Sequence, residues 1–364
     1  MQCGIVGLPN VGKSTLFNAL TKTKSAIAAN YPFCTIDPNE GVAEIYDEQL
    51  IILAKIANSE KIINSYIKFV DIAGLVKGAS TGEGLGNQFL GNIRNTDAIV
   101  HVVRCFDDEN ITHVNGNVNP IYDIEIINTE LILSDIETIK KKRANIEKKA
   151  RIQKTPDLID ELNLLDECEE LLNNGKCIRE KYNEILHKNV KQLGLLTSKP
   201  IIYVANVTEE FINKGNDWSN QVKEIAIKEN ASFALISAST EETIANLEDE
   251  TEKLEYMQML DIKISGLSNV AGLCRNALNI KTFYTIGKKE ARSWHFKNGM
   301  KAPETAGIIH TDFEKGFIRA EVIGYNDYIQ YNGESGAKEA GKWRLEGKTY
   351  IVQDGDVMHF RFNV

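Results

Sequence analysis

A phosphate-binding loop lies near the start of the sequence, where residues 7–14 read Gly-Leu-Pro-Asn-Val-Gly-Lys-Ser directly after an apolar run at residues 3–6. The apolar run suits a buried strand, and the loop matches the pattern Gly-x-x-x-x-Gly-Lys-Ser. Backbone N–H groups of such a loop converge on an anion, and the next helix adds its positive N-terminus. We therefore predict a strand, a loop and a helix that hold a nucleoside phosphate. The residues predicted to bind it are Asn10, Val11, Gly12, Lys13, Ser14 and Thr15.

An acid for a magnesium ion follows at the end of a second strand-like run, residues 67–71. Asp71 opens the sequence Asp-Ile-Ala-Gly, in which the acid binds Mg²⁺ through water and Gly74 donates its N–H to the γ-phosphate. Ser14 and Thr35 are the other predicted Mg²⁺ ligands, although Thr35 could equally be an ordinary loop threonine. Lys13 is expected to neutralise the β and γ phosphates, so Lys13 and Gly74 join the predicted catalytic set.

The base-recognition sequence departs from the guanine-reading pattern. A strand-like run at residues 200–205 ends in Asn206-Val207-Thr208-Glu209, where a guanine-reading protein carries Asn-Lys-x-Asp. Aspartate reads guanine because its two acceptors match the N1–H and N2–H₂ donors. Glu209 adds a methylene and Val207 removes the lysine stem that lies over the base, so guanine specificity should be weak or lost. Ser237 is predicted to flank the base. The alternative is that residues 206–209 form only a turn after the strand.

The chain resembles the YchF or Obg-like ATPase family over essentially its whole length. The strings that carry the resemblance are residues 4–20, 71–79, 84–90 and 311–320. The resemblance implies a translation-factor-related P-loop protein that prefers ATP over GTP, in agreement with the reading of residues 206–209.

Leu75 stands where a Ras-like protein places its water-orienting glutamine. Leucine cannot orient water, so intrinsic hydrolysis should be slow unless another polar group enters the site. By similarity to the family, His113 in a polar loop takes this catalytic place. The alternative is a solvated loop histidine. Asn10 could help to coordinate K⁺ between the phosphates, or it could simply form the turn.

A helical insertion interrupts the alternation of strands and helices between residues 123 and 187. Thr155 and Pro156 supply a cap and a first helical position, so two helices should meet there. We predict an antiparallel coiled-coil hairpin, in which thirty helical residues would project roughly 45 Å. The apolar positions that fall on a heptad frame are Ile132, Ile136, Ile139, Ile146, Leu158, Leu162, Leu165 and Leu172.

Short β-like runs return after Lys281, and this part resembles the small ubiquitin-like TGS domain, a β-grasp fold. In the family the domain implies a contact with RNA or the ribosome, and a purely structural lid is the alternative. The predicted runs are residues 282–286, 317–323, 350–352 and 357–362. The predicted domains are a G-type α/β nucleotide domain with a mostly parallel sheet (1–120 and 191–280), a coiled-coil insertion (121–190) and a TGS domain (281–364).

Charge and composition point to a cytoplasmic protein with a polyanionic partner. The 364 residues are 43% hydrophobic with a net charge of −9, and the six cysteines show no metal-ligand spacing. No apolar run approaches membrane-spanning length, so we expect a soluble chain, which we take to be a monomer. Yet residues 140–154 hold one acid, Glu147, among the basic residues Lys140, Lys141, Lys142, Arg143, Lys148, Lys149, Arg151 and Lys154. This tip suits the ribosome or its RNA, and a solvated helix end is the alternative.

The combined prediction is a ribosome-associated nucleotidase that binds and slowly hydrolyses ATP with Mg²⁺ as a molecular switch in translation or stress regulation. Two alternatives stay open. One is an Obg-type GTPase in which Glu209 still reads guanine, and the other is a binding factor that uses the nucleotide as a structural ligand with negligible turnover.

Overall fold

The computed structural model describes residues 1–30, 40–72, 85–108, 117–153, 155–181 and 190–363. These residues form two compact units. Of the described residues, the first unit contains 1–28, 40–42 and those between 68 and 274, and the second contains 29–30, 43–67 and 275–363. Among the described residues, no helix has both the length and the apolar character needed to cross a bilayer.

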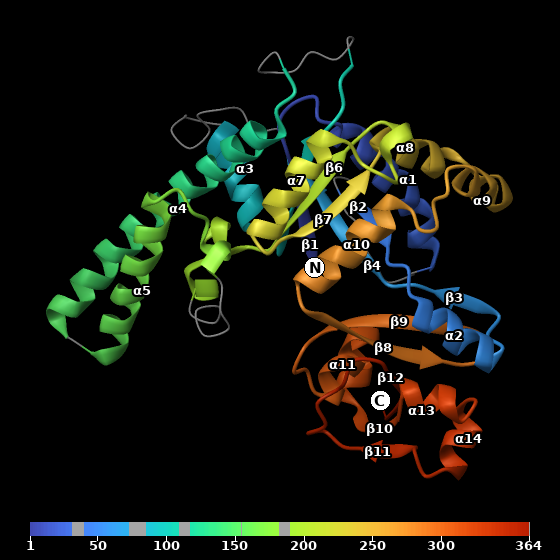
Figure 1. Ribbon diagram of the computed structural model, residues 1–364. Helices are drawn as coiled ribbons and strands as arrows, with labels where there is room; N and C mark the ends of the chain where they lie inside the picture. The colour runs from blue at the N-terminus through green and yellow to red at the C-terminus, as the bar shows by residue number, and fades with distance from the viewer. Residues whose placement is uncertain (31–39, 73–84, 109–116, 154, 182–189, 364) are drawn as a thin grey trace. The chain divides into compact units, whose positions relative to one another are not determined.

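The first unit is built on a mostly parallel six-stranded sheet in the order β2-β4-β1-β5-β6-β7 (Figure 1). Strands β5 and β6 are buried along their whole length, as expected for a parallel sheet that is covered on both faces. The strands are β1 (Gln2–Val6), β2 (Glu40–Glu44), β4 (Tyr66–Asp71), β5 (Ala98–Arg104), β6 (Ile201–Asn206) and β7 (Ser232–Ile236). The accompanying helices are α1 (Lys13–Asn30), α3 (Leu85–Arg94), α7 (Asp217–Lys228), α8 (Ala238–Asn246), α9 (Glu250–Met259) and α10 (Gly266–Ala277).

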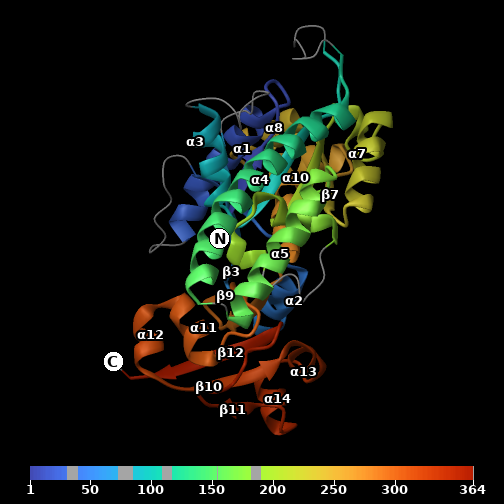
Figure 2. The ribbon, with the colours of Figure 1, turned by 90° about the vertical axis from the view of Figure 1, so that its left-hand side faces the viewer.

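The predicted helical insertion is confirmed as a pair of helices that lie side by side, α4 (Pro120–Ile152) and α5 (Pro156–Asn173) (Figures 1 and 2). Thr155 occupies the N-cap of α5, as predicted, but its side chain makes no capping hydrogen bond. The heptad residues meet in one core that continues to η1 (Ile178–Lys181) and to the segment before η2 (Leu196–Ser198). Isoleucines from α4 and leucines from α5 therefore hold the hairpin together.

Charges on this hairpin are separated between its two helices. The far half of α4 carries the basic residues, whereas α5 contains seven acids and no basic residue. Arg143 of α4 pairs with Asp166 at 2.8 Å and with Glu169 at 2.5 Å. The basic surface is therefore one edge of the arm, which we call the basic edge. It consists of the exposed side chains Lys140, Lys141, Lys148, Lys149 and Arg151.

The second unit is a six-stranded mixed sheet in the order β11-β10-β12-β8-β9-β3. Alternate strand residues supply two apolar cores, as the two-residue period of a strand requires. Phe283 and Phe360 belong to the core that includes residues of α11, whereas Tyr284 and Ile323 belong to the core that includes residues of α2 and α13. The elements are α2 (Glu48–Ala57), β3 (Lys61–Ile63), β8 (Ile280–Ile286), β9 (Glu290–Lys297), α11 (Ala302–Ile309), α12 (Thr311–Lys315), β10 (Phe317–Gly324), α13 (Tyr325–Gln330), α14 (Glu334–Glu339), β11 (Arg344–Glu346) and β12 (Asp356–Phe362).

The division of the chain differs from the predicted domain boundaries. Residues 43–67, predicted as part of the nucleotide domain, belong to the second unit. The cause is long-range pairing, because β3 adds to β9 in parallel and Leu50 and Leu53 of α2 enter a core of the second unit. The run at residues 350–352 was also predicted as a strand, but it forms only an isolated bridge from Ile351 to Lys301.

Candidate functional site

The phosphate-binding loop joins β1 to α1 and is shaped by a tight contact at Gly12. Gly12 has φ +96°, and a Cβ atom there would lie 2.2 Å from Nδ2 of Asn206. Asn10 also adopts a left-handed conformation with φ +63°, which asparagine tolerates better than most residues. The glycine at position 12 is therefore required by the backbone conformation and by the close approach of the base loop.

Lys13 lies at the first position of α1 and its ammonium group folds over the loop. Its Nζ donates to the carbonyl oxygens of Gly7 at 2.9 Å and Leu8 at 2.8 Å, and the residue is 9% exposed. Burial lowers the pKa of Lys13 to about 8, while the nearby charge of Asp71 acts in the opposite direction. Lys13 is thus a cation held with incomplete solvation, which a polyphosphate would stabilise.

Asp71 ends β4 and pairs in register with Ile5 of β1, so its carboxylate lies at the edge of the sheet from which the loop leaves. Burial raises the pKa of Asp71, and Lys13 opposes this rise. Ser14 lies at the second position of α1. A serine hydroxyl and one carboxylate fit Mg²⁺, which is usually held by few protein oxygens together with phosphates and water.

Several predicted residues lie outside the part of the chain that the structure describes. They are Thr35, Gly74, Leu75 and His113. Their predicted roles, in the Mg²⁺ shell, at the γ-phosphate and in handling the attacking water, therefore stay predictions.

A cavity of about 440 Å³ opens between the phosphate-binding loop and the strand ends that follow it. It brings together the loop residues and residues 206–208 of the predicted base loop, and it also includes side chains that were not predicted. Phe106 and Asp108 lie in the segment that follows β5, and their position just beyond the carboxyl end of a buried parallel strand is the signal that could have identified this wall. The lining residues are Asn10, Gly12, Lys13, Ser14, Thr15, Phe106, Asp108, Asn206, Val207, Thr208, Ala238 and Ser239.

Asn206 is the last residue of β6 and connects the two sides of this cavity. Its Nδ2 donates to the carbonyl oxygen of Val11 at 2.9 Å, and its Oδ1 accepts from the N–H of Ala238 at 2.9 Å. The side chain is 3% exposed. Val207 is buried beside it, and its N–H donates to the carbonyl oxygen of Ile236. The amide of Asn206 thus fixes the distance between the phosphate-binding loop and the base side of the cavity.

Two residues predicted to contact the nucleotide make other contacts. Ser237 is fully buried at the N-cap of α8, where its Oγ accepts from the N–H of Thr240, and its neighbours Ala238 and Ser239 line the cavity instead. Glu209 is not among the lining residues. Its carboxylate accepts hydrogen bonds from the Tyr256 hydroxyl at 2.8 Å and from Oγ1 of Thr240 at 3.4 Å.

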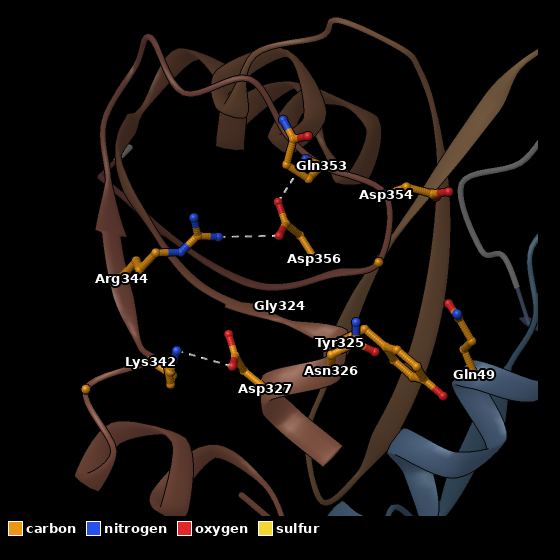
Figure 3. A pocket seen from close by; sticks show the side chains of 12 residues that line it. Gln49, Gly324, Tyr325, Asn326, Asp327, Lys342, Arg344, Gln353, Asp354 and Asp356 are labelled. Atoms are coloured by element: carbon orange, nitrogen blue, oxygen red, sulfur yellow. Dashed lines mark hydrogen bonds and ion pairs between the residues drawn. The ribbon is translucent and has the colours of Figure 1, made fainter. Parts of the chain in front are cut away.

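A larger cavity, about 560 Å³, lies within the second unit (Figure 3). The charged groups that Figure 3 shows around it are paired inside the protein. Arg344 lies 3.6 Å from Asp356, and Lys342 lies 3.7 Å from Asp327. We assign no ligand to this cavity, since its cations already have carboxylate partners.

These features together define a P-loop nucleotide-binding protein of the GTPase class. The sheet is parallel, a phosphate-binding loop follows its first strand, an acid ends a neighbouring strand, and a base loop follows a third. Comparison with family models agrees. Residues 2–134 match the family described as 50S ribosome-binding GTPase, and residues 280–363 match YchF-GTPase_C, described as a protein of unknown function.

The chain belongs to the YchF family. It is 53% identical to the ribosome-binding ATPase YchF of Bacillus subtilis over 100% of both chains. It is 52% identical to the protein of the same name from Escherichia coli O157:H7, over 100% of this chain and 99% of that one. The solved structure of the Schizosaccharomyces pombe YchF GTPase superposes with a TM-score of 0.86 at 37% identity, covering 99% of this chain and 97% of that one.

Proposed function

We propose that this protein is an ATP hydrolase that prefers ATP over GTP and acts on or near the ribosome as a nucleotide-dependent switch. The relatives named ribosome-binding ATPase support the reaction and the partner. The proposed preference for adenine over guanine is supported by the position of Glu209. Its carboxylate accepts a hydrogen bond from Tyr256, and the residue does not line the cavity. A guanine-reading carboxylate would have to face the base edge, so this geometry disfavours the Obg-type alternative.

The proposed metal site uses Ser14, Asp71 and Thr35 for Mg²⁺. The ion would shield the phosphate charge beside Lys13, whose ammonium group binds the β and γ phosphates. The left-handed turn at Asn10 lies in the cavity wall, and we propose it as the residue that would contact K⁺.

For catalysis we propose His113 as the group that orients or deprotonates the attacking water, because Leu75 cannot do so. An imidazole titrates near neutrality, and a positioned group of this kind contributes about 10² to 10⁴ in rate. Without it, hydrolysis depends on the loop backbone, Lys13 and the metal, and should be slow.

For ribosome contact we propose the basic edge of α4 together with the second unit. The exposed lysines of this edge can neutralise RNA phosphates, and binding through them would fall with salt. Arg143 is excluded from this surface, since it is paired with two acids of α5.

Titration and turnover test this function together. Equilibrium titration with Mg-ATP and with Mg-GTP should give the lower Kd for ATP, and ribosomes should accelerate ATP turnover. His113→Ala should lower turnover and leave the Kd for ATP nearly unchanged. Much tighter binding of GTP would return the GTPase alternative, and turnover that stays negligible with and without ribosomes would leave a nucleotide-stabilised binding factor.

A further inference from the structure

Glu209 is held from outside the nucleotide cavity by a residue 47 positions later in the chain. It begins η3 (Glu209–Phe211), immediately after the residues of β6 and its loop that line the cavity. A single carboxylate oxygen, Oε2, accepts the 2.8 Å bond from Tyr256 and the 3.4 Å bond from Thr240. The shorter bond therefore dominates the orientation of this carboxylate.

Tyr256 is well placed to act as a fixed donor. It lies on α9, which starts from an N-cap at Asp249 and follows α8 in the same unit (Figure 1). The ring is half-buried, and burial together with Glu209 raises the pKa of the Tyr256 phenol. The hydroxyl thus keeps its proton at physiological pH and donates it to the carboxylate, a charge-assisted bond that is stronger than a neutral one.

We propose that Tyr256 is a positioning residue for base selectivity, whose hydroxyl keeps the Glu209 carboxylate turned away from the base edge. The inference rests on the proposed preference for ATP and names the residue that maintains it. A released carboxylate at this position would meet the N1–H and N2–H₂ donors of guanine, and it would repel the N1 lone pair of adenine. Tyr256 therefore suppresses guanine binding without touching the nucleotide.

The test is a double-mutant cycle read as the ratio of Kd for Mg-GTP to Kd for Mg-ATP. Tyr256→Phe removes one hydroxyl and leaves the ring, so the ratio should fall by about two- to fivefold, the size expected for losing a charge-assisted hydrogen bond that is exposed to solvent. In a Glu209→Ala background the same change should have no effect, and the double variant should show the ratio of Glu209→Ala alone. Tyr331→Phe, in the second unit, is the matched control and should keep the parent ratio.

The outcomes separate this inference from the proposed function. A parent protein that binds ATP more tightly, with an unchanged ratio in a folded Tyr256→Phe variant, overturns the role of Tyr256 and leaves the ATPase proposal standing. A changed ratio that persists in the Glu209→Ala background also overturns it, because Tyr256 would then act by another route. A parent protein that prefers GTP refutes the proposed function itself, independently of the variants. Thermal unfolding of each variant confirms that the comparison is made on folded protein.

Discussion

Removing Glu229 should destabilise the nucleotide unit by about 3 to 5 kcal/mol, because it leaves a buried guanidinium without its carboxylate. Oε2 of Glu229 accepts from Nε of Arg179 at 3.1 Å and from the Tyr203 hydroxyl at 2.8 Å. Arg179 also donates to Oδ1 of Asn128 at 2.7 Å. The network therefore joins η1 to the arm helix α4, to β6 and to the residue that follows α7.

The magnitude follows from burial. Arg179 is 7% exposed and Glu229 is 9% exposed, so water cannot replace the lost partner without opening the structure. Among the described residues, Nη1 of Arg179 already has no hydrogen-bond partner, which leaves Arg179 little further compensation. Glu229→Gln keeps the shape and an acceptor, so it should cost about 1.5 to 3 kcal/mol. The double variant Arg179→Met/Glu229→Met removes both charges and should cost clearly less than the sum of the two single Met variants.

Urea unfolding, followed by far-ultraviolet circular dichroism, measures these free energies, and hydrogen exchange in the peptide containing β6 locates the effect. The reasoning is wrong if Glu229→Ala costs less than about 1 kcal/mol. It is equally wrong if the Arg179→Met and Glu229→Met effects simply add, since two coupled buried charges cannot behave as independent sites.

Three further changes test the phosphate-binding loop and the arm. Burial lowers the pKa of Lys13 to about 8. The affinity for ATP, measured by calorimetry, should therefore fall by up to about tenfold per pH unit above that value, whereas the affinity for adenosine, which has no phosphate, should not fall. Gly12→Ala should destabilise the protein by about 1 to 3 kcal/mol in denaturant unfolding. Gly272→Ala should instead stabilise α10 by about 0.5 to 1 kcal/mol, because an added Cβ there would meet nothing within 4 Å beyond its chain neighbours and the backbone of its own helix. Lys148→Glu combined with Lys149→Glu should weaken co-sedimentation with ribosomes and flatten its salt dependence without changing the Kd for ATP.

Each of these has an outcome that contradicts it. ATP affinity that is constant across about pH 7 to about pH 9 would mean that Lys13 keeps its proton in the free protein. Equal stability of the two glycine variants would remove the steric argument at Gly12. Unchanged co-sedimentation after charge reversal would return the basic edge to an ordinary solvated helix surface.

Local sequence predicted the parts of the molecule that depend on short-range pattern. Spacing within short stretches of sequence was enough to predict three features. These are the loop at residues 7–14, the strand end at Asp71 and the heptad residues of α4 and α5. The sequence also predicted that the phosphate-binding loop and residues 206–208 lie together, because parallel strands deliver their ends to one edge of the sheet. It did not predict Phe106, Asp108, Ala238 or Ser239 in the wall of this cavity, and it wrongly placed Ser237 and Glu209 there.

The contacts that sequence could not predict join residues far apart in the chain. The strand β3 has only three residues and is largely exposed, so nothing in its pattern indicates that it pairs with β9. The bond from Tyr256 to Glu209 is equally invisible, because its partner is fixed by where α9 lies in the fold. The ion pairs of Arg143 with acids of α5 also join residues that are distant in the chain, so they could not be predicted. Because of them, the basic surface is a single edge of the arm and not the whole expected tip.

Residues 43–67 belong to the second unit although most of that unit comes much later in the chain, and this sets an order for folding during synthesis. Leu50 and Leu53 need partners such as Tyr284 and Val357, and the first of these strands, β8, emerges roughly 220 residues after α2. At about 5 to 20 residues per second, α2 must wait for about ten seconds or more with its apolar side uncovered. The nascent chain therefore carries an unfinished amphipathic segment through most of its translation, which is a point at which a chaperone would be expected to bind. For the same reason, a fragment that begins at β8 would lack α2 and β3 and would expose the core side chains that they cover.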